Sequence, residues 1–308
     1  MIARIGKLLL CFVFFFTLLP LKPIEAASGI MQIAAGNYHT LVLKSDGTVW
    51  GWGGNLGGEL GDGTAADHPE MSQVQGLTNV IAIATGDSSS LALKSDHTVW
   101  TWGANRFGQL GDGTIVDHKT PVQVKGPDGN GFLNDVIAID GGTKFSVALK
   151  SDGTVWAWGD NEFGQLGNGT NVNSLFPVQV SGLSGIKEIA AGNAHTLALK
   201  EDGTVWAWGY NGLGQLGCGN NAESKVPVQV IHPDDLSKPF QGVSKIAAAG
   251  YYSVALQADG EAWAWGSNAA GQLGNGTITT STLPVKVKDE NNPENQLKGI
   301  VAIDGSAD

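Results

Sequence analysis

The stretch Ile189–Val230 reads IAAGNAHTLALKEDGTVWAWGYNGLGQLGCGNNAESKVPVQV and contains one complete copy of a repeated unit. Two short runs of alternating apolar residues flank the turn Glu201-Asp202-Gly203, which is the pattern of a β-hairpin. The second run carries the signature Trp-x-Trp-Gly, which occurs five times at first-Trp spacings of 50, 56, 50 and 57 residues. A fixed period of this length indicates a repeat architecture.

The hairpin turn recurs in every copy with one informative exchange. Four copies have glycine at its third position, and the second copy has His97. Histidine tolerates positive φ better than most other side chains. We therefore expect His97 to adopt the turn conformation that glycine adopts elsewhere.

All ten tryptophans belong to these five units. Side chains two residues apart on a strand point to the same face, and the residue between the two rings is small in every copy. One ring buries roughly 150–250 Å², which contributes about 4–6 kcal/mol as an upper bound at about 25 cal/mol per Å². We predict that the rings form the structural core between neighbouring sheets: Trp50, Trp52, Trp100, Trp102, Trp156, Trp158, Trp206, Trp208, Trp263 and Trp265.

Each copy continues with a glycine-rich run, a variable polar loop and a further strand. In four copies a proline such as Pro227 stands at the start of the motif Pro-Val-x-Val, and the first residue of a strand is a position where a sheet tolerates proline. Each repeat thus offers about four short strands, which is the content of one propeller blade.

The string G-x-x-H-T-L-x-L-K-x-D-G-T-V-W-x-W-G-x-N-x-x-G-Q-L-G-[DN]-G-T, seen well at residues 36–64 and 142–170, closely resembles the repeat of the RCC1 (regulator of chromosome condensation) family. The chain looks like an exported, bacterial-type member. The resemblance implies an all-β fold, an RCC1-like β-propeller of four-stranded antiparallel blades, typically seven, around a central channel. We assign residues 27–308 to the propeller, with repeats at about 29–78, 79–134, 135–184, 185–241 and 242–298.

The number of repeats departs from the family pattern. Five complete repeats are followed by residues 299–306, which match the opening strand of a repeat at residues 80–87. We expect residues 299–308 to provide the first strand of a sixth repeat and interpret the chain as truncated relative to a longer propeller. An open arc and a ring closed with fewer blades are the alternatives.

Residues 1–26 resemble a secretory signal peptide. Arg4 and Lys7 precede an apolar run from Leu8 to Leu19, and Ile24-Glu25-Ala26 offers a cleavage site. An uncleaved membrane anchor is the alternative, but twelve apolar residues are too few to span a bilayer comfortably. We expect a secreted or cell-surface protein without a membrane span after cleavage.

The charge balance argues against nucleic acid as a partner. Cleavage would remove three basic residues and one acidic residue and shift the formal net charge from −11 to −13. Nucleic-acid binding depends on clustered Lys and Arg, whereas Arg106 is the one arginine beyond the signal. A single cysteine, Cys218, remains and cannot form an internal disulfide. It occupies a turn position that Asp or Asn fills elsewhere, which indicates drift rather than a reactive thiol.

Catalytic and metal-binding patterns are not found in the sequence. His39 and His195 occupy equivalent positions and are best interpreted as strand-entry residues that make local hydrogen bonds, because neither has a second ligand at helix or hairpin spacing. The acidic turns lack the ligand ladder of a calcium loop. The glycine-rich runs precede no helix and so differ from phosphate-binding loops. We predict a protein that is not an enzyme and uses no cofactor or metal.

Binding residues are expected where the repeats differ, because function tends to lie on loops held by a rigid scaffold. Three linkers are expanded or acidic, at residues 125–135, 231–241 and 288–298. The first two contain isolated phenylalanines that either pack on their own blade or anchor a partner. Tyrosines and a lysine also stand before the second strand of several repeats. The candidate partner-binding residues are Phe132, Phe240, Tyr251, Tyr252, Tyr38 and Lys144.

These features favour an exported, non-catalytic scaffold that presents loops to a protein or a cell-envelope polymer. Two alternatives stay open. The family name suggests a guanine-nucleotide exchange factor for a small GTPase, which requires a location inside the cell. A resemblance in fold and compartment to a secreted RCC1-like propeller that plugs the active-site cleft of β-lactamases suggests an inhibitor of a secreted enzyme. A hydrolase hidden in the central channel has little support, because the repeated aspartates fall in hairpin turns.

Overall fold

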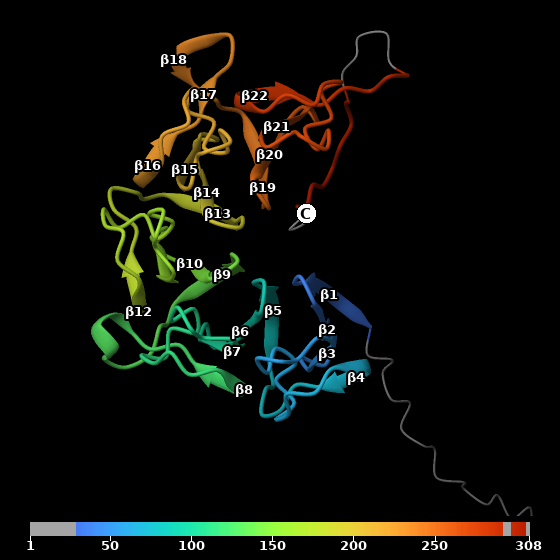
Figure 1. The fold of residues 1–308 in the computed structure, drawn as a ribbon, viewed down its shortest axis with the longest axis vertical. Helices are drawn as coiled ribbons and strands as arrows, with labels where there is room; N and C mark the ends of the chain where they lie inside the picture. The colour runs from blue at the N-terminus through green and yellow to red at the C-terminus, as the bar shows by residue number, and fades with distance from the viewer. Residues whose placement is uncertain (1–28, 292–296, 306–308) are drawn as a thin grey trace, which may run out of the picture.

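The computed structural model describes residues 29–291 and 297–305, so the proposed signal at residues 1–26 lies outside the described residues. The described chain forms five four-stranded antiparallel sheets and one two-stranded hairpin. The five sheets stand radially around a central channel as the blades of a propeller (Figure 1). This arrangement confirms the predicted fold class. The strands are β1 (Ile30–Ala35), β2 (His39–Lys44), β3 (Val49–Gly53) and β4 (His68–Gln73) in blade 1; β5 (Val80–Thr85), β6 (Ser89–Lys94), β7 (Val99–Gly103) and β8 (His118–Gln123) in blade 2; β9 (Val136–Gly141), β10 (Phe145–Lys150), β11 (Val155–Gly159) and β12 (Ser174–Gln179) in blade 3; β13 (Ile186–Ala191), β14 (His195–Lys200), β15 (Val205–Gly209) and β16 (Ser224–Gln229) in blade 4; the hairpin β17 (Ile231–His232) and β18 (Asp235–Pro239); and β19 (Val243–Ala249), β20 (Tyr252–Gln257), β21 (Ala262–Gly266) and β22 (Ser281–Lys286) in blade 5.

The tight turns between the second and third strands are built as the sequence predicts. In blade 1, Gly47 has a φ of 75° and its N–H donates to the carbonyl of Lys44 at 2.9 Å. His97 replaces this glycine in blade 2 and adopts a φ of 63°, which confirms the expectation. The aspartate of the turn accepts from the following threonine, whose hydroxyl then accepts from the first tryptophan, as at Trp50 Nε1 and Thr48 Oγ1, 3.0 Å apart.

Neighbouring blades are joined by the second tryptophan of each unit. Trp158 is fully buried against blade 2, and its Nε1 donates to the carbonyl of Gln109 at 2.9 Å. The ring lies so close to Gly111 that a β-carbon there would approach its Nε1 to 2.8 Å, and Gly111 also has a φ of 65°. Glycine is therefore required at this position for two reasons, the positive φ and the lack of space for a β-carbon. The same joint recurs between the other successive blades at Trp102, Trp208 and Trp265.

The first tryptophans are less buried than the sequence suggested. Trp50, Trp100, Trp156 and Trp206 are half-buried at the turn end of their blades, and Trp263 alone of this group is fully buried. In blade 1 the ammonium group of Lys44 lies 3.8 Å from the centre of the Trp50 ring. The prediction of ten core rings therefore holds for Trp263, whereas Trp100 and Trp206 pack against the core but stay partly exposed. It is wrong for Trp50 and Trp156, because solvent and a lysine side chain cover part of these rings.

Blades 1 and 5 flank the open side of the ring (Figure 1). Trp52 is half-buried, and Ile33 is 60% exposed whereas its equivalent Ile83 is 2% exposed. On blade 5, Gln272 and Gly274 are exposed at positions where the other blades hold the next tryptophan. Each of these two faces therefore carries half of an inter-blade joint.

Residues 299–305 follow the path of an innermost strand without entering a sheet. The N–H of Ile300 donates to the carbonyl of Gly260 at 3.3 Å, as the N–H of Val80 does to Gly47 at 3.1 Å. Ile303, Asp304 and Gly305 then line the channel beside blade 5. The segment thus lies where the first strand of a sixth repeat was expected.

The buried and the half-buried tryptophans should differ in how much stability is lost when the ring is removed. Trp158→Ala should destabilise the protein by about 3–5 kcal/mol, because it opens a core cavity and removes one of the two donors to the Gln109 carbonyl. Trp52→Ala is the matched control and should cost less than half as much. Urea unfolding followed by circular dichroism measures both. Equal losses for the two variants would contradict this account of the joints.

Candidate binding face

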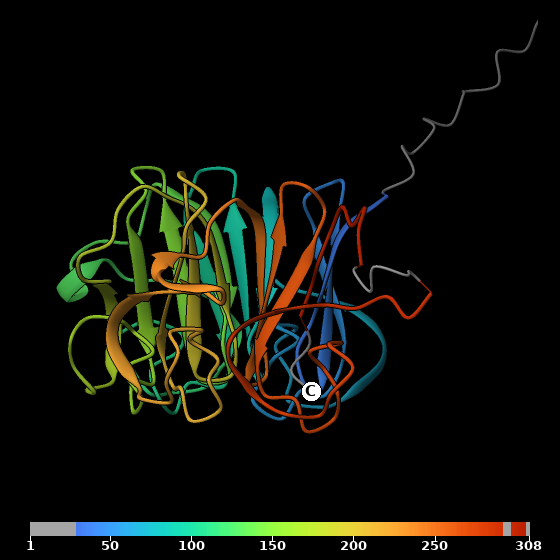
Figure 2. The same ribbon diagram turned by 90° about the horizontal axis from the view of Figure 1, so that it is seen from above.

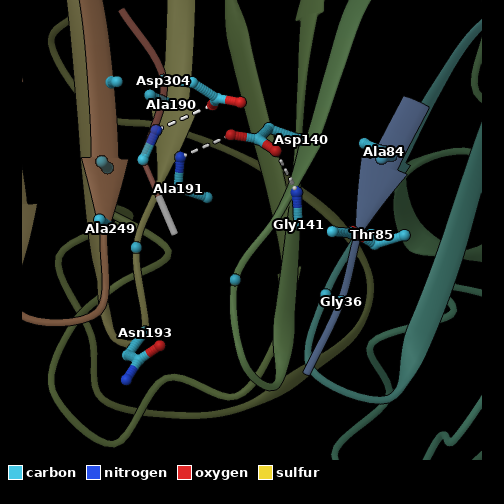
Figure 3. A pocket seen from close by; sticks show the side chains of 18 of the residues that line it. Gly36, Ala84, Thr85, Asp140, Gly141, Ala190, Ala191, Asn193, Ala249 and Asp304 are labelled. Carbon is cyan, nitrogen blue, oxygen red and sulfur yellow. Dashed lines mark hydrogen bonds between the residues drawn. The ribbon is translucent and has the colours of Figure 1, made fainter. Parts of the chain in front are cut away.

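The central channel forms a cavity with a volume of about 780 Å³. Its wall consists of the innermost strands β1, β5, β9, β13 and β19 together with residues 303–305 (Figure 3). The side chains along these strands are mostly Ala, Gly and Ile, so much of the wall is backbone. The ionisable residues among the lining groups are Asp87, Asp140 and Asp304.

Asp140 ties two blades together inside the channel. Its carboxylate accepts from the N–H of Gly141 at 2.9 Å and from the N–H of Ala191 on blade 4 at 2.8 Å (Figure 3). Burial raises the pKa of Asp140 to about 6, and the nearby Asp304 carboxylate adds to this effect while the two N–H groups oppose it. The group is therefore a structural bridge whose charge is poorly compensated.

The two ends of the blades differ in chemistry. The turn end carries the Asp–Thr hydrogen bonds of the hairpins in blades 1 to 4, and hydrogen bonds from Thr154 hold the pKa of Asp152 below its ordinary value. The other end carries the loops between the first and second strands and the loops after the third strands. We call this second end the loop face. In the side view its irregular loops gather at the lower end of the blades (Figure 2).

Four of the six predicted binding residues lie at the loop face. Tyr38, Lys144 and Tyr251 occupy equivalent positions directly before or at the start of the second strand, and all are exposed. Tyr252 follows Tyr251, pairs with Gly266 in the ladder and is half-buried. The structure therefore brings residues from blades 1, 3 and 5 to one end of the molecule.

Aromatic rings form a ridge across this face. The rings of Phe163, Tyr210 and Tyr251 come from blades 3, 4 and 5 and stack edge to face, with centroids 5.0 and 5.6 Å apart. On the neighbouring pair of blades, the ammonium group of Lys144 lies 4.5 Å from the centre of the Phe107 ring. All four tyrosines of the sequence thus lie at the loop face. The sequence did not point to Tyr210, Phe163 or Phe107, because their proximity arises only between blades.

Aliphatic side chains extend the ridge outward. The loops that carry them are held against the same end, since Asn161 Nδ2 donates to the carbonyl of Val172 at 3.1 Å. Leu56, at the same end of blade 1, is 86% exposed. The sequence signal for the other four residues is an apolar side chain in an otherwise polar loop after Gly-x-Gly-Thr, whereas Leu56 precedes this motif. The exposed aliphatic residues of the loop face are Leu56, Ile115, Val116, Val172 and Ile278.

The phenylalanines of the expanded linkers do not join this surface. Phe240 is fully buried against Trp263 and Trp265, with ring centroids 5.2 and 6.1 Å away. Its assignment as a binding residue is therefore wrong, because the β17–β18 hairpin uses it to pack on blade 5. Phe132 is 48% exposed beneath the Lys125 ammonium group, in the linker that leads to β9 at the turn end.

The two equivalent histidines are part of the joints between blades. His39 Nε2 lies 2.9 Å from Ser90 Oγ, and His195 Nε2 lies 3.0 Å from Ser253 Oγ. Burial lowers the pKa of His39 to about 4 and that of His195 to about 3, so both are neutral at pH 7. These hydrogen bonds cross to the next blade, whereas the sequence suggested local ones. Within the described residues, no group of three or more His, Cys, Asp or Glu could hold a metal ion.

The fold and its repeats agree with a known family. The RCC1-like domain matches residues 17–307. The chain belongs to the RCC1-like domain family. Mouse E3 ubiquitin-protein ligase HERC2 is 31% identical over 82% of this chain, and the Arabidopsis thaliana ultraviolet-B receptor UVR8 is 32% identical over 84%. The chain spans 5% of the length of that HERC2 and 46% of UVR8.

Solved structures show the same architecture. Human WBSCR16 superposes with a TM-score of 0.76 at 27% identity, covering 90% of this chain and 70% of that protein. Prp20p of Saccharomyces cerevisiae superposes with a TM-score of 0.59 at 24% identity, covering 90% of this chain and 80% of that protein. None of the described helical segments is long and apolar enough to cross a bilayer.

Alanine substitution of the two linker phenylalanines distinguishes a core residue from a surface residue. Phe240→Ala should cost about 3–5 kcal/mol, since a buried aromatic ring is lost from the blade. Phe132→Ala should change stability by less than about 0.5 kcal/mol, as expected for a surface position. Chemical unfolding midpoints measure both, and a stable Phe240→Ala variant would overturn the packing role.

The raised pKa of Asp140 predicts a pH effect of definite sign. A carboxyl with a folded pKa of about 6 binds more protons than the unfolded chain between pH 4 and pH 6. Its contribution to stability therefore falls as the pH rises through this window. In Asp140→Asn this fall should disappear from the thermal midpoint. The pKa of Asp152 is lowered, so its contribution to stability is lost as the pH falls. In Asp152→Asn this loss of stability on acidification should disappear.

Proposed function

We propose that the protein is an exported, non-catalytic binding module that docks a protein partner on the loop face. The observation that carries this proposal is the gathering of exposed tyrosine and aliphatic side chains from blades 1, 2, 3 and 5 at one end. Contiguous exposed apolar surface on a soluble scaffold marks an interaction site. The turn end also exposes apolar side chains, among them Met31, Ile81 and Ile137, but it carries none of the four tyrosines.

The composition of the loop face favours a protein over a polysaccharide or nucleic acid. Tyrosines supply large contact area at low entropic cost and are enriched among residues that dominate binding energy. The aliphatic side chains of Val172 and Ile278 suit an apolar protein surface and would gain little from a sugar. The formal net charge of −11 opposes phosphate backbones.

The RCC1-like fold supports a protein partner in general. Yeast Prp20p, which shares the fold, has binding properties toward Gsp1p and histones and has been crystallised with Kap60. A protein partner for this chain would therefore be in keeping with its architecture. Its own partner must be decided by the side chains of its loop face, because a fold hosts many functions.

Export and the lack of catalysis complete the proposal. The positively charged start and short apolar run of residues 1–26 support secretion or display at the cell surface. The carboxylates of the channel serve as a backbone bridge at Asp140 rather than as an acid–base pair facing a nucleophile. An inhibitor of a secreted enzyme would be one form of this function, and an exchange factor would require retention inside the cell.

Site-specific crosslinking tests the docking face. A photoreactive benzoylphenylalanine placed at Tyr251 should capture a discrete partner from the medium or cell surface of the producing organism. The same group at Glu201, an exposed position at the turn end, is the matched control and should capture none. Equal capture from both positions would contradict the proposed face.

The affinity of the captured partner gives the second readout. Loss of a central tyrosine in Tyr251→Ser should weaken binding about 30-fold, which corresponds to about 2 kcal/mol. Glu201→Ser should leave the affinity unchanged. Surface plasmon resonance measures both, and wild-type affinity in Tyr251→Ser and Tyr38→Ser together would remove the loop face from consideration.

A further inference from the structure

The wall of the channel is made of strand edges. Each of β1, β5, β9, β13 and β19 is the first strand in the order of its sheet and has one hydrogen-bonded neighbour strand. The opposite edge of each borders the channel, where the lining side chains are small. Such an edge presents backbone N–H and C=O groups that can pair with another extended chain.

One side chain already binds this wall as a peptide group would. The carboxamide of Gln32 donates to the carbonyl of Ile83 at 2.7 Å and accepts from the N–H of the same residue at 2.9 Å. A strand added to the edge of β5 would make this pair of bonds with its own backbone. The edge is therefore able to hold an amide group from the channel side.

Toward the loop face the edge of β5 lies beside β9, since a β-carbon on Gly141 would lie 2.9 Å from the carbonyl oxygen of Thr85. Gln32 binds the backbone of Ile83, whereas Thr85 lies two residues nearer to the mouth and also lines the cavity. Around the mouth stands one polar or small residue from each blade, among them Asn37, Thr143 and Asn193. The opening thus leads from the apolar loop face to a wall of backbone groups.

We propose that the channel binds an extended peptide segment of the docked partner, which enters from the loop face and pairs with the edges of the innermost strands. This inference rests on the proposed function and adds to it the form of the ligand. The cavity of about 780 Å³ lies within the range of roughly 300–1,000 Å³ that is usual for ligand sites. The lining strand β5 is six residues long, so a segment of comparable length fits beside it.

The lining also selects the chemistry of the segment. Close approach of backbones requires small side chains, so glycine, alanine and serine fit and large rings do not. The charged lining groups are the carboxylates of Asp87, Asp140 and Asp304, so a further carboxylate would be both desolvated and repelled by like charge. We therefore assign the channel to extended segments that are poor in bulky and acidic residues.

Selection from a random dodecapeptide library displayed on phage tests this assignment. The bait is the protein described here, and the channel-blocking variant is Ala35→Trp, since Ala35 is exposed and lines the channel near its mouth. Ala222→Trp, at an exposed loop position outside the channel lining, is the matched control. Enriched peptides should be small-residue-rich, bind Ala222→Trp like the wild type and bind Ala35→Trp at least tenfold more weakly.

Amide hydrogen exchange distinguishes peptides bound in the channel from peptides that adhere to the outer surface. The selected peptides should slow exchange in β5 and β9 and leave the outermost strands β8 and β12 unchanged. Peptides that bind Ala35→Trp as tightly as the wild type, protection confined to the outer strands, or no enrichment above an unrelated bait would each overturn the inference. If Tyr251→Ser still weakens binding of the captured partner while Ala35→Trp leaves that binding unchanged, the proposed function stands and the channel site alone fails.

Discussion

The hydrogen bond from a buried indole N–H to a backbone carbonyl of the preceding blade is the interaction on which this structure depends. At each of the four joints the ring is fully buried, and the carbonyl that accepts from its N–H also accepts from a serine or threonine hydroxyl on the blade of that ring. An unpaired buried indole N–H would cost about 1–3 kcal/mol. The ring also needs the space that a glycine with positive φ leaves at the facing turn. Each joint thus links two blades through two donors, one shared carbonyl and one glycine.

This joint explains why the two ends of the molecule differ. The turn end is committed to structure, because the turn aspartate, the threonine and the first tryptophan form a hydrogen-bonded relay within the hairpins of blades 1, 2 and 3. The loops at the other end need to supply only the buried asparagine that holds them in place, such as Asn161. The remaining loop side chains are free to differ between copies. Exposed tyrosine, leucine, valine and isoleucine therefore accumulate at the loop face without disturbing the joints.

The channel follows from the same geometry. Radial sheets bring their first strands close together at the axis, and the backbones approach so closely that a β-carbon on Gly86 would lie 2.5 Å from the carbonyl oxygen of Gly142. Side chains such as Gln32 and Asp140 then satisfy part of the exposed strand edges across the blades. A wall of backbone groups beneath the loop face is a consequence of blade packing.

The sequence by itself determined the period, the hairpins, the turn conformation at His97 and the family, because these depend on residues that are neighbours along one chain segment. It also placed Tyr38, Lys144 and Tyr251 at equivalent, variable positions of the repeat. Only the tertiary structure decided that the first tryptophans are half-buried and that Phe240 is core. The same holds for the ridge that Phe163 and Tyr210 form with Tyr251. These facts arise between blades, where residues about fifty positions apart come into contact, and no local pattern records which side of a repeat its neighbour covers.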